Sequence, residues 1–261
     1  LPIIDRPNLQ YITEECHRSG IEELILIIND DKPEIKDYFS RDLELEETLL
    51  EHGKTECAEM VKEVASLIKI RFVTQKKQLG LGNAVLCAKE AVGDEDFALI
   101  LGDDLVFNEE NPAIGQLIRT YEKTNHTILG IQKVEHDQVN KYGIISYNSK
   151  IDEKTYIVSS LVEKPKIEDT PSDLACVGRY ILKNKIFHYL ENIKPSKKGE
   201  YELTDALKEY LQNDEIDAYE FDGIRYDIGD KFGYIKATID FALRRDDLKE
   251  ELKNYLRKLK L

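Results

Sequence analysis

The stretch Glu23-Leu24-Ile25-Leu26-Ile27-Ile28 decides the fold, because five apolar residues follow one another without a polar break. A strand with one solvated face alternates apolar and polar residues, so an unbroken apolar run indicates burial on both faces. The β-forming runs Ile70–Val73 and Phe97–Leu101 follow, and a stretch with helical periodicity precedes each of the three runs. This alternation predicts an α/β fold: a three-layer sandwich whose central sheet is mixed but mainly parallel.

The pattern changes after about Lys123, where strands with short polar connections predict a more antiparallel, smaller β/α lobe. The strands expected in this region are Thr127–Val134, Gly143–Tyr147, Tyr156–Val162 and Leu174–Leu182. Helical periodicity returns in Thr204–Gln212 and in Lys231–Leu261, and the latter predicts an amphipathic helix pair that packs on the core or on a sister subunit. The charged segment Arg41–Leu67 is expected to be a helical surface excursion. No Pro-, Gly- or Ser-rich linker divides the chain, so we predict a single domain over residues 1–261.

Charge and hydropathy exclude several classes of partner. The chain has 37 Lys and Arg against 51 Asp and Glu, a formal charge of 37 − 51 = −14, which repels nucleic acid and anionic membranes. No apolar run approaches the roughly 18 to 20 residues of a membrane span, and the segment Leu1–Asp5 lacks the basic start of a signal peptide. We therefore expect a cytoplasmic protein with no nucleic-acid or membrane partner.

The cysteines and histidines suggest no metal centre or nucleophilic triad. The four cysteines are scattered without the CxxC spacing of a zinc site, so we expect reduced thiols packed as small apolar residues. They are Cys16, Cys57, Cys87 and Cys176. No histidine lies near a serine or cysteine nucleophile motif, which argues against Ser-His-Asp hydrolase chemistry. The histidines are His17, His52, His126, His136 and His188.

The first candidate site is the segment from Gln75 to Ala84, which follows a predicted strand and opens the predicted helix Ala84–Ala91. Its two glycines, Gly80 and Gly82, would let the backbone approach a flat ligand closely, and the helix start adds partial positive charge. A tight turn with a glycine cap explains the same residues without a ligand. The spacing alone leaves both interpretations open.

Two acidic segments could form a divalent metal site. Asp103 and Asp104 follow the carboxyl end of the predicted strand Phe97–Leu101, where ligands bind in open α/β sheets, although Gly-Asp-Asp is also ordinary turn chemistry. Asp227 precedes a glycine and the start of a predicted helix, so it is either the N-cap of that helix or a second carboxylate beside Asp103.

A cation and a carboxylate adjoin in Val162-Glu163-Lys164-Pro165, after a predicted strand. Glu163 could accept sugar hydroxyls while Lys164 binds a phosphate. A surface ion pair before a turn explains the same residues without a ligand.

Taken in order, eight segments resemble the bacterial UTP–glucose-1-phosphate uridylyltransferases. The resemblance runs from Leu1 to about Leu243, and its specificity lies in the ordered set. The segments are LPIIDRPNLQYITEE, QKKQLGLGNAVLCAKEAVGDE, LGDD, KYGIIS, VEKP, GRYIL, GEYELTDAL and YDIGDKFGYIKA. The chain departs from the family at Asn83, where histidine is frequent, and at Asp104, since some members have a single aspartate there.

The resemblance implies a nucleotide-diphospho-sugar transferase-like fold and a role for each candidate residue. Gln75 and the backbone of Gly80–Gly82 would read the uracil of UTP. Asp103 and Asp227 would hold Mg²⁺, with Asp103 and Lys164 as the catalytic residues. Gly143, Glu163 and Lys164 would bind glucose and its phosphate. The chain would then divide into a nucleotide-binding half (about 1–125), a sugar-binding half (about 126–230) and C-terminal helices (about 231–261).

The implied function is the formation of UDP-glucose and pyrophosphate from UTP and glucose-1-phosphate by a homo-oligomer. Three alternatives stay open: a related nucleotidyltransferase with another base or sugar, a non-catalytic protein that binds nucleotide sugars, and an acidic α/β interaction module.

Family members open with a strand and a G-x-G-T-R loop followed by P-K-E-M, whereas this chain begins with the Leu-Pro-Ile that comes next. We therefore expect the natural protein to be longer. We also expect the present chain to keep affinity for UDP-glucose but to turn over roughly 100-fold more slowly or worse, because donors to the UTP phosphates are lost.

Overall fold

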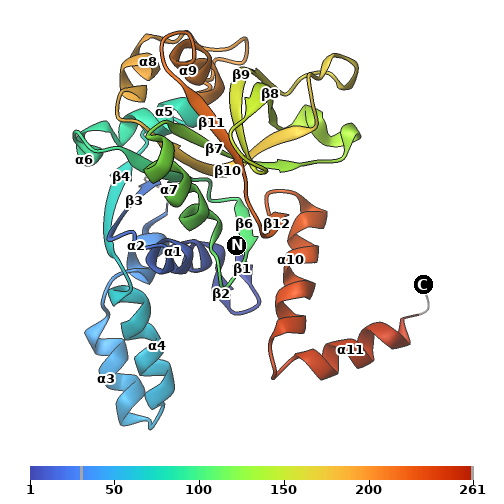
Figure 1. The fold of residues 1–261 in the computed structure, drawn as a ribbon. Coiled ribbons are helices and arrows are strands. Elements are labelled where there is room, and N and C mark those ends of the chain that lie inside the picture. Colours follow the sequence, from blue (N-terminus) through green and yellow to red (C-terminus); the bar gives the residue numbers. More distant parts are fainter. Residues whose placement is uncertain (30–31, 260–261) are drawn as a thin grey trace.

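A six-stranded sheet forms the centre of the computed structural model, which describes residues 1–29 and 32–259 (Figure 1). The strand order is β5 (Phe97–Ile100), β10 (Leu174–Leu182), β7 (Thr127–Lys133), β11 (Ile216–Glu220), β9 (Thr155–Glu163) and β8 (Gly143–Lys150). β11 runs parallel to β7, and the other neighbouring strands of this sheet run antiparallel.

The side chains of the central strands point alternately into two hydrophobic clusters. In β7, Leu129 and Ile131 join the cluster that holds buried residues of α5 (Leu81–Cys87), α8 (Ile186–Asn192) and α9 (Leu203–Tyr210). Ile128, the residue before Leu129, joins the cluster of α7 (Ala113–Thr124) on the opposite face. Figure 1 accordingly shows α8 and α9 on one face of the sheet and α7 on the other. The predicted three-layer α/β sandwich with a mixed sheet is confirmed.

The expectation that this sheet is mainly parallel needs correction. Among the described residues, β3 (Glu23–Ile28) and β4 (Lys69–Thr74) pair in parallel as a separate two-stranded sheet. The larger sheet is mostly antiparallel because its strands double back, as in the hairpin of β8 and β9, whose short connection cannot cross over the sheet.

The remaining elements surround these sheets. α1 (Asn8–Arg18) follows the short strands β1 (Pro2–Ile3) and β2 (Arg6–Pro7), while α6 (Lys89–Val92) extends α5. β6 (Asp104–Phe107) pairs with β12 (Ile224–Asp227), and two short 3₁₀ helices are η1 (His136–Lys141) and η2 (Ile167–Asp169).

The predicted surface excursion is a helical arm that projects from the body (Figure 1). After α2 (Pro33–Tyr38), the helices α3 (Leu43–Glu51) and α4 (Thr55–Ser66) pack against each other. The carboxylate of Asp42 caps α3 by accepting a 2.9 Å hydrogen bond from the amide of Leu45.

The predicted C-terminal helix pair is α10 (Lys231–Arg244) and α11 (Lys249–Lys258), and residues 260–261 of the predicted range lie outside the described residues. α10 packs on the core, since Ala237 and Phe241 share a cluster with Leu105 and Tyr226. Within its bounds α11 has no buried residue, and it extends away from the body (Figure 1).

All four cysteines, which lie within the described residues, are free thiols. Cys16 and Cys176 are buried in hydrophobic clusters as expected, whereas Cys57 is exposed on α4 and corrects the expectation that every thiol is packed. Across residues 1–29 and 32–259, no helix combines the length and apolar character that a bilayer crossing requires.

Candidate active site

The carboxylates of Asp103 and Asp227 converge beside Gly229. Asp103 comes directly before β6 and Asp227 ends β12, and the amide of Ile228 donates to the carbonyl oxygen of Asp103 at 2.9 Å. A Cβ atom placed on Gly229 would lie 3.3 Å from Oδ1 of Asp227 and 3.4 Å from Oδ2 of Asp103. Two residues more than a hundred positions apart therefore present oxygens to one small space, which stays open because residue 229 has no side chain.

Asp104, the neighbouring carboxylate, is committed to the protein interior. It is only 5% exposed, and both Nε and Nη2 of Arg225 lie 2.5 Å from its Oδ1. Burial raises the pKa of Asp104 above its ordinary value, against the attraction of Arg225. Gly178 has a left-handed φ of +62°, and a Cβ there would lie 2.5 Å from Oδ2 of Asp104. The exposed Asp103 is therefore the member of the pair that faces solvent.

The backbone of Asp104 is fixed by a second buried ion pair. Arg179, whose side chain is fully buried, donates from Nε and Nη2 to the carboxylate of Glu15 at 3.0 and 2.7 Å. Its Nη1 donates to the carbonyl oxygen of Asp104 at 3.0 Å, and Glu15 also accepts from the amide of Ile114 at 3.0 Å. The Glu15–Arg179 pair thus ties α1, β6, β10 and the first turn of α7 together beneath the acidic pair.

Asp230, and not Asp227, caps α10. Its Oδ2 accepts from the amides of Phe232 and Gly233, both at 3.0 Å. Asp227 Oδ1 instead accepts from the amide of Asp230 at 3.2 Å. The N-cap alternative for Asp227 is therefore wrong, while its proximity to Asp103 remains.

A second group of predicted residues surrounds a small cavity of about 60 Å³ between β8, β9 and α9. Gly143 and Glu163 stand opposite each other in the β8–β9 register, and the hydroxyl of Thr204 donates to Oε2 of Glu163 at 2.6 Å. A Cβ on Gly143 would lie 3.3 Å from the same oxygen. Glycine at this position therefore keeps the Glu163 carboxylate accessible from the cavity.

Lys164 lies beside this cavity in a strained conformation. Its φ of +45° is left-handed, which is uncommon for a residue other than glycine and occurs where the surroundings impose it. Its amide donates to the carbonyl oxygen of Tyr142 at 2.9 Å, and its Nζ lies 3.4 Å from Oε1 of Glu163. The predicted surface ion pair is present, and its carboxylate partner, Glu163, lines the cavity.

Glu202 and Thr204 also line this cavity, and sequence reasoning did not single them out. Burial, and then the nearby charge of Glu163, raises the pKa of Glu202 above its ordinary value. Both residues lie in the GEYELTDAL segment, so the available signal was the family resemblance rather than their spacing.

The third predicted group, around Gln75, is held together by its own side chains. The Gln75 amide donates to Oδ1 of Asn83 at 2.9 Å and to the carbonyl oxygen of Gly80 at 3.3 Å. α5 begins at Leu81 and not at the expected Ala84, with Gly80 as its N-cap at a φ of +95°. The predicted glycine cap is therefore present, and Gly82 belongs to the first helical turn.

The backbone of residues 200–202 lies against both glycines of this loop. Gly82 donates to the carbonyl oxygen of Tyr201 at 2.8 Å, and the amide of Tyr201 donates to the carbonyl oxygen of Leu79 at 2.7 Å. A Cβ on Gly80 or Gly82 would lie 2.9 or 2.8 Å from the Tyr201 oxygen. These glycines were expected to let the loop backbone approach a flat ligand; in the structure they let it approach the backbone of Tyr201. The contact joins this loop to the segment that carries Glu202.

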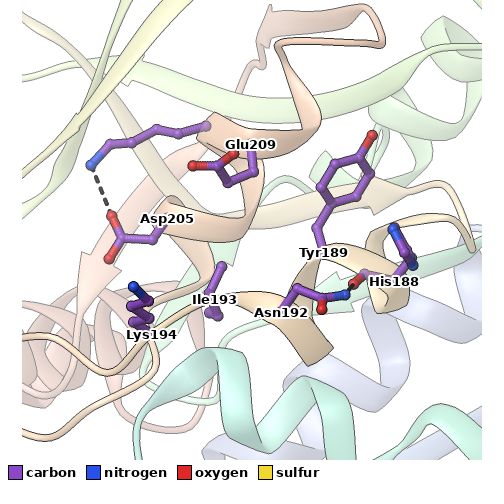
Figure 2. A pocket seen from close by; sticks show the side chains of 8 residues that line it. His188, Tyr189, Asn192, Ile193, Lys194, Asp205 and Glu209 are labelled. Atoms are coloured by element: carbon purple, nitrogen blue, oxygen red, sulfur yellow. Dashed lines mark hydrogen bonds and ion pairs between the residues drawn. The ribbon is translucent and has the colours of Figure 1, made fainter.

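A larger cavity of about 540 Å³ lies elsewhere, between α8 and α9. Figure 2 shows its charged and polar lining, which includes His188, Asn192, Lys194 and Glu209 and the ion pair of Asp205 with Lys208 at 2.9 Å. No predicted site residue lines it. Because its charges are of both signs and solvated, we place the candidate site at the convergent acids and the smaller cavity.

Residues 1–242 match the sequence model of the nucleotidyl transferase family. This match covers most of the chain, which therefore belongs to the nucleotidyl transferase family.

Two kinds of comparison narrow this class. The chain is 45% identical over 261 residues to UTP–glucose-1-phosphate uridylyltransferase 2 of Staphylococcus saprophyticus, covering 100% of this chain and 90% of that relative. A UTP-bound UGPase from Acinetobacter baumannii superposes with a TM-score of 0.90 at 34% identity, covering 99% of this chain and 90% of the other. A UDP-glucose pyrophosphorylase complexed with UDP-glucose gives a TM-score of 0.85 at 35% identity, with 94% and 90% covered. Within its family, the chain belongs to the UTP–glucose-1-phosphate uridylyltransferases.

Proposed function

We propose that this protein forms UDP-glucose and pyrophosphate from UTP and glucose-1-phosphate. The observation that carries the proposal is the convergence of Asp103 and Asp227 beside Gly229 in a chain of this family. The names of its relatives, and neighbours bound to UTP and to UDP-glucose, support the choice of substrates.

We further propose that Asp103 and Asp227 hold Mg²⁺. Carboxylate oxygens suit this hard cation, which is usually bound through one or two carboxylates and completes its shell with substrate phosphates and water. Among the described residues no group of three or more His, Cys, Asp or Glu is arranged so that it could hold a metal ion. A site of two carboxylates suits Mg²⁺ better than a metal that needs a full set of protein ligands. The bound ion would neutralise charge on the reacting phosphates.

In the proposed reaction, a phosphate oxygen of glucose-1-phosphate attacks the α-phosphorus of UTP. The bond from that phosphorus to the bridging oxygen of the β-phosphate breaks, and pyrophosphate leaves. Such transfers depend mainly on positioning and charge neutralisation. Lys164, whose side chain is 53% exposed, is the cation proposed for the sugar phosphate.

Recognition of the two substrates would use the other predicted residues. Glu163 is the proposed acceptor for glucose hydroxyls, with Gly143 leaving space beside it. Gln75 and the backbone of Gly80 and Gly82 are proposed to read the uracil, since an amide side chain offers both donors and an acceptor.

The test is pyrophosphate release from a panel of nucleotides and sugar phosphates, measured over long incubations so that slow turnover is detected. We expect UTP with glucose-1-phosphate to give the highest kcat/KM. Preference for another base or sugar would make the protein a related nucleotidyltransferase. Calorimetric binding of UDP-glucose with no release for any pair would indicate a non-catalytic binding protein, and no binding would indicate an interaction module.

A homo-oligomer is also proposed, and the C-terminal helices are the surface that suggests it. Phe232 and Ile235 of α10 and Tyr255 of α11 are large apolar side chains that are 67%, 50% and 60% exposed. Light scattering after size exclusion should give a mass above that of one chain. A mass of 30.2 kDa, that of one chain, would refute it. The cytoplasmic location stays a prediction.

A further inference from the structure

One side chain, Arg225 of β12, contacts both halves of the candidate site. Its Nε and Nη2 bind Oδ1 of Asp104, and its Nη2 lies 3.8 Å from Oδ2 of Asp227. On its other side, Nη1 donates to the hydroxyl of Tyr142 at 3.2 Å, and the guanidinium carbon lies 4.7 Å from the centre of the Tyr142 ring. The side chain is 12% exposed, so these contacts are largely shielded from water.

Tyr142 carries the contact to the sugar side of the site. Its carbonyl oxygen accepts the amide of Lys164 at 2.9 Å, the residue with the strained left-handed backbone. It also immediately precedes Gly143, which pairs with Glu163 in the β8–β9 register. A displacement of Tyr142 would therefore shift the residues proposed to bind glucose and its phosphate.

The anchor of Arg225 cannot easily move. Asp104 is buried, its backbone carbonyl accepts a hydrogen bond from Arg179, and its second carboxylate oxygen faces Gly178. Because the guanidinium is planar and one of its edges is bound to this carboxylate, its other N–H groups and its face point in fixed directions. A lysine ammonium has no such plane and could not make these contacts together.

We propose that Arg225 is a positioning residue that fixes the distance between the metal-side carboxylate Asp227 and the phosphate-side Lys164, through its stacked contact with Tyr142. The inference rests on the proposed function and adds a residue and a role to it. Arg225 is not proposed as a catalytic residue, because its nitrogens are engaged by protein groups. An ion pair with Asp104 alone would explain neither the stacking on Tyr142 nor the approach to Asp227.

The test uses Arg225→Lys and Tyr142→Leu, with Arg245→Lys as the matched control. Arg225→Lys keeps a cation for Asp104 but removes the fork, and Tyr142→Leu removes the ring and its hydroxyl. Arg245 forms ion pairs with Asp5 and Asp247, neither of which is a candidate site residue.

Two readouts are required: Mn²⁺ affinity in the presence of UDP-glucose, measured by electron paramagnetic resonance, and the separate KM values for UTP and glucose-1-phosphate. Loss of a group that orients a metal ligand typically weakens metal binding by about 10-fold or more, so we expect that loss in Arg225→Lys. We expect Tyr142→Leu to raise KM for glucose-1-phosphate by about 10-fold and KM for UTP by less than about 2-fold. Arg245→Lys should match the wild type in both readouts.

The inference is overturned if Arg225→Lys folds and retains both Mn²⁺ affinity and KM for glucose-1-phosphate. If Arg225→Lys does not fold, Tyr142→Leu decides: an unchanged ratio of the two KM values overturns the inference, and a selective rise supports it. A wild-type protein that releases no pyrophosphate refutes the proposed function and this inference together. A wild-type protein that is active beside unaffected variants refutes the inference alone.

Discussion

Replacing Glu15 by glutamine should destabilise the protein strongly, because it removes the charge that compensates Arg179. Glu15 is 3% exposed and the side chain of Arg179 is fully buried, with two hydrogen bonds of 3.0 and 2.7 Å between them. Breaking a buried pair on one side costs about 3–5 kcal/mol. Glutamine retains one oxygen that can accept from Arg179 or from the amide of Ile114. We therefore expect the free energy of unfolding to fall by about 3 kcal/mol, the lower end of this range.

Urea denaturation followed by circular dichroism measures this loss, and for a chain of this size it corresponds to a fall in Tm of roughly 6–12 °C. The matched control is Glu191→Gln, which breaks the ion pair with Lys89 where both side chains are nearly half exposed. That change should cost less than about 1 kcal/mol. If Glu15→Gln costs no more than Glu191→Gln, the reasoning about the buried network beneath Asp104 is refuted.

Three further predictions concern packing, ionisation and thiol reactivity. Gly82→Ala should cost about 1–3 kcal/mol of stability, because its Cβ would lie 2.8 Å from the Tyr201 oxygen; a neutral effect in urea denaturation would argue against that contact. Burial opposes ionisation of Asp96, but hydrogen bonds from Tyr121, Lys183 and the amide of Asn184 lower its pKa below the ordinary value. Its carboxylate therefore stabilises the fold at pH values above the unfolded pKa of about 3.9, and this stabilisation is lost as the pH falls through the folded pKa. Urea denaturation should show that Asp96→Asn destabilises the protein near neutral pH and much less in acid. Burial raises the pKa of the Cys16 and Cys176 thiols to about 12, so a thiol reagent at mildly alkaline pH should label exposed Cys57 first, and peptide mapping that finds Cys16 or Cys176 labelled in the folded protein would contradict this.

Local pattern was sufficient to predict most elements from the sequence. The strand bounds Glu23–Ile28 and Leu174–Leu182 are those of β3 and β10, because long apolar runs of β-forming residues leave little choice. Strand direction was not predictable in the same way. β5 pairs antiparallel with β10, more than seventy residues later, and no local pattern records which strands become neighbours.

Some site residues could likewise be predicted from local sequence, and others depend on long-range pairing. Asp103 and Glu163 lie in short motifs whose residue types and positions were enough to make them candidates, whereas Gly143 was selected only through the family resemblance. Arg225 and Asp104 acquire their roles only when β6 and β12 pair, in a register that sets Asp104 opposite Asp227. The beginning of α5 was placed too late for a similar reason, because the distant Tyr201 holds the loop before it.

Residue type alone could not decide whether Asp227 or Asp230 caps α10. Both aspartates precede α10, and aspartate is a good N-cap at either position. The carboxylate that receives two amide hydrogen bonds is that of Asp230, and this depends on where the helix begins. Asp227 is thereby left beside Asp103.

A double-mutant cycle on Asp103 and Asp227 tests the central claim most directly, with kcat/KM for pyrophosphate release from UTP and glucose-1-phosphate as the measured quantity. If both carboxylates hold one metal ion, Asp103→Asn and Asp227→Asn should each reduce kcat/KM by about 100-fold or more, and the double variant should lose little beyond the weaker single variant. Single variants with wild-type kcat/KM, or losses that multiply in the double variant, would contradict a shared metal site.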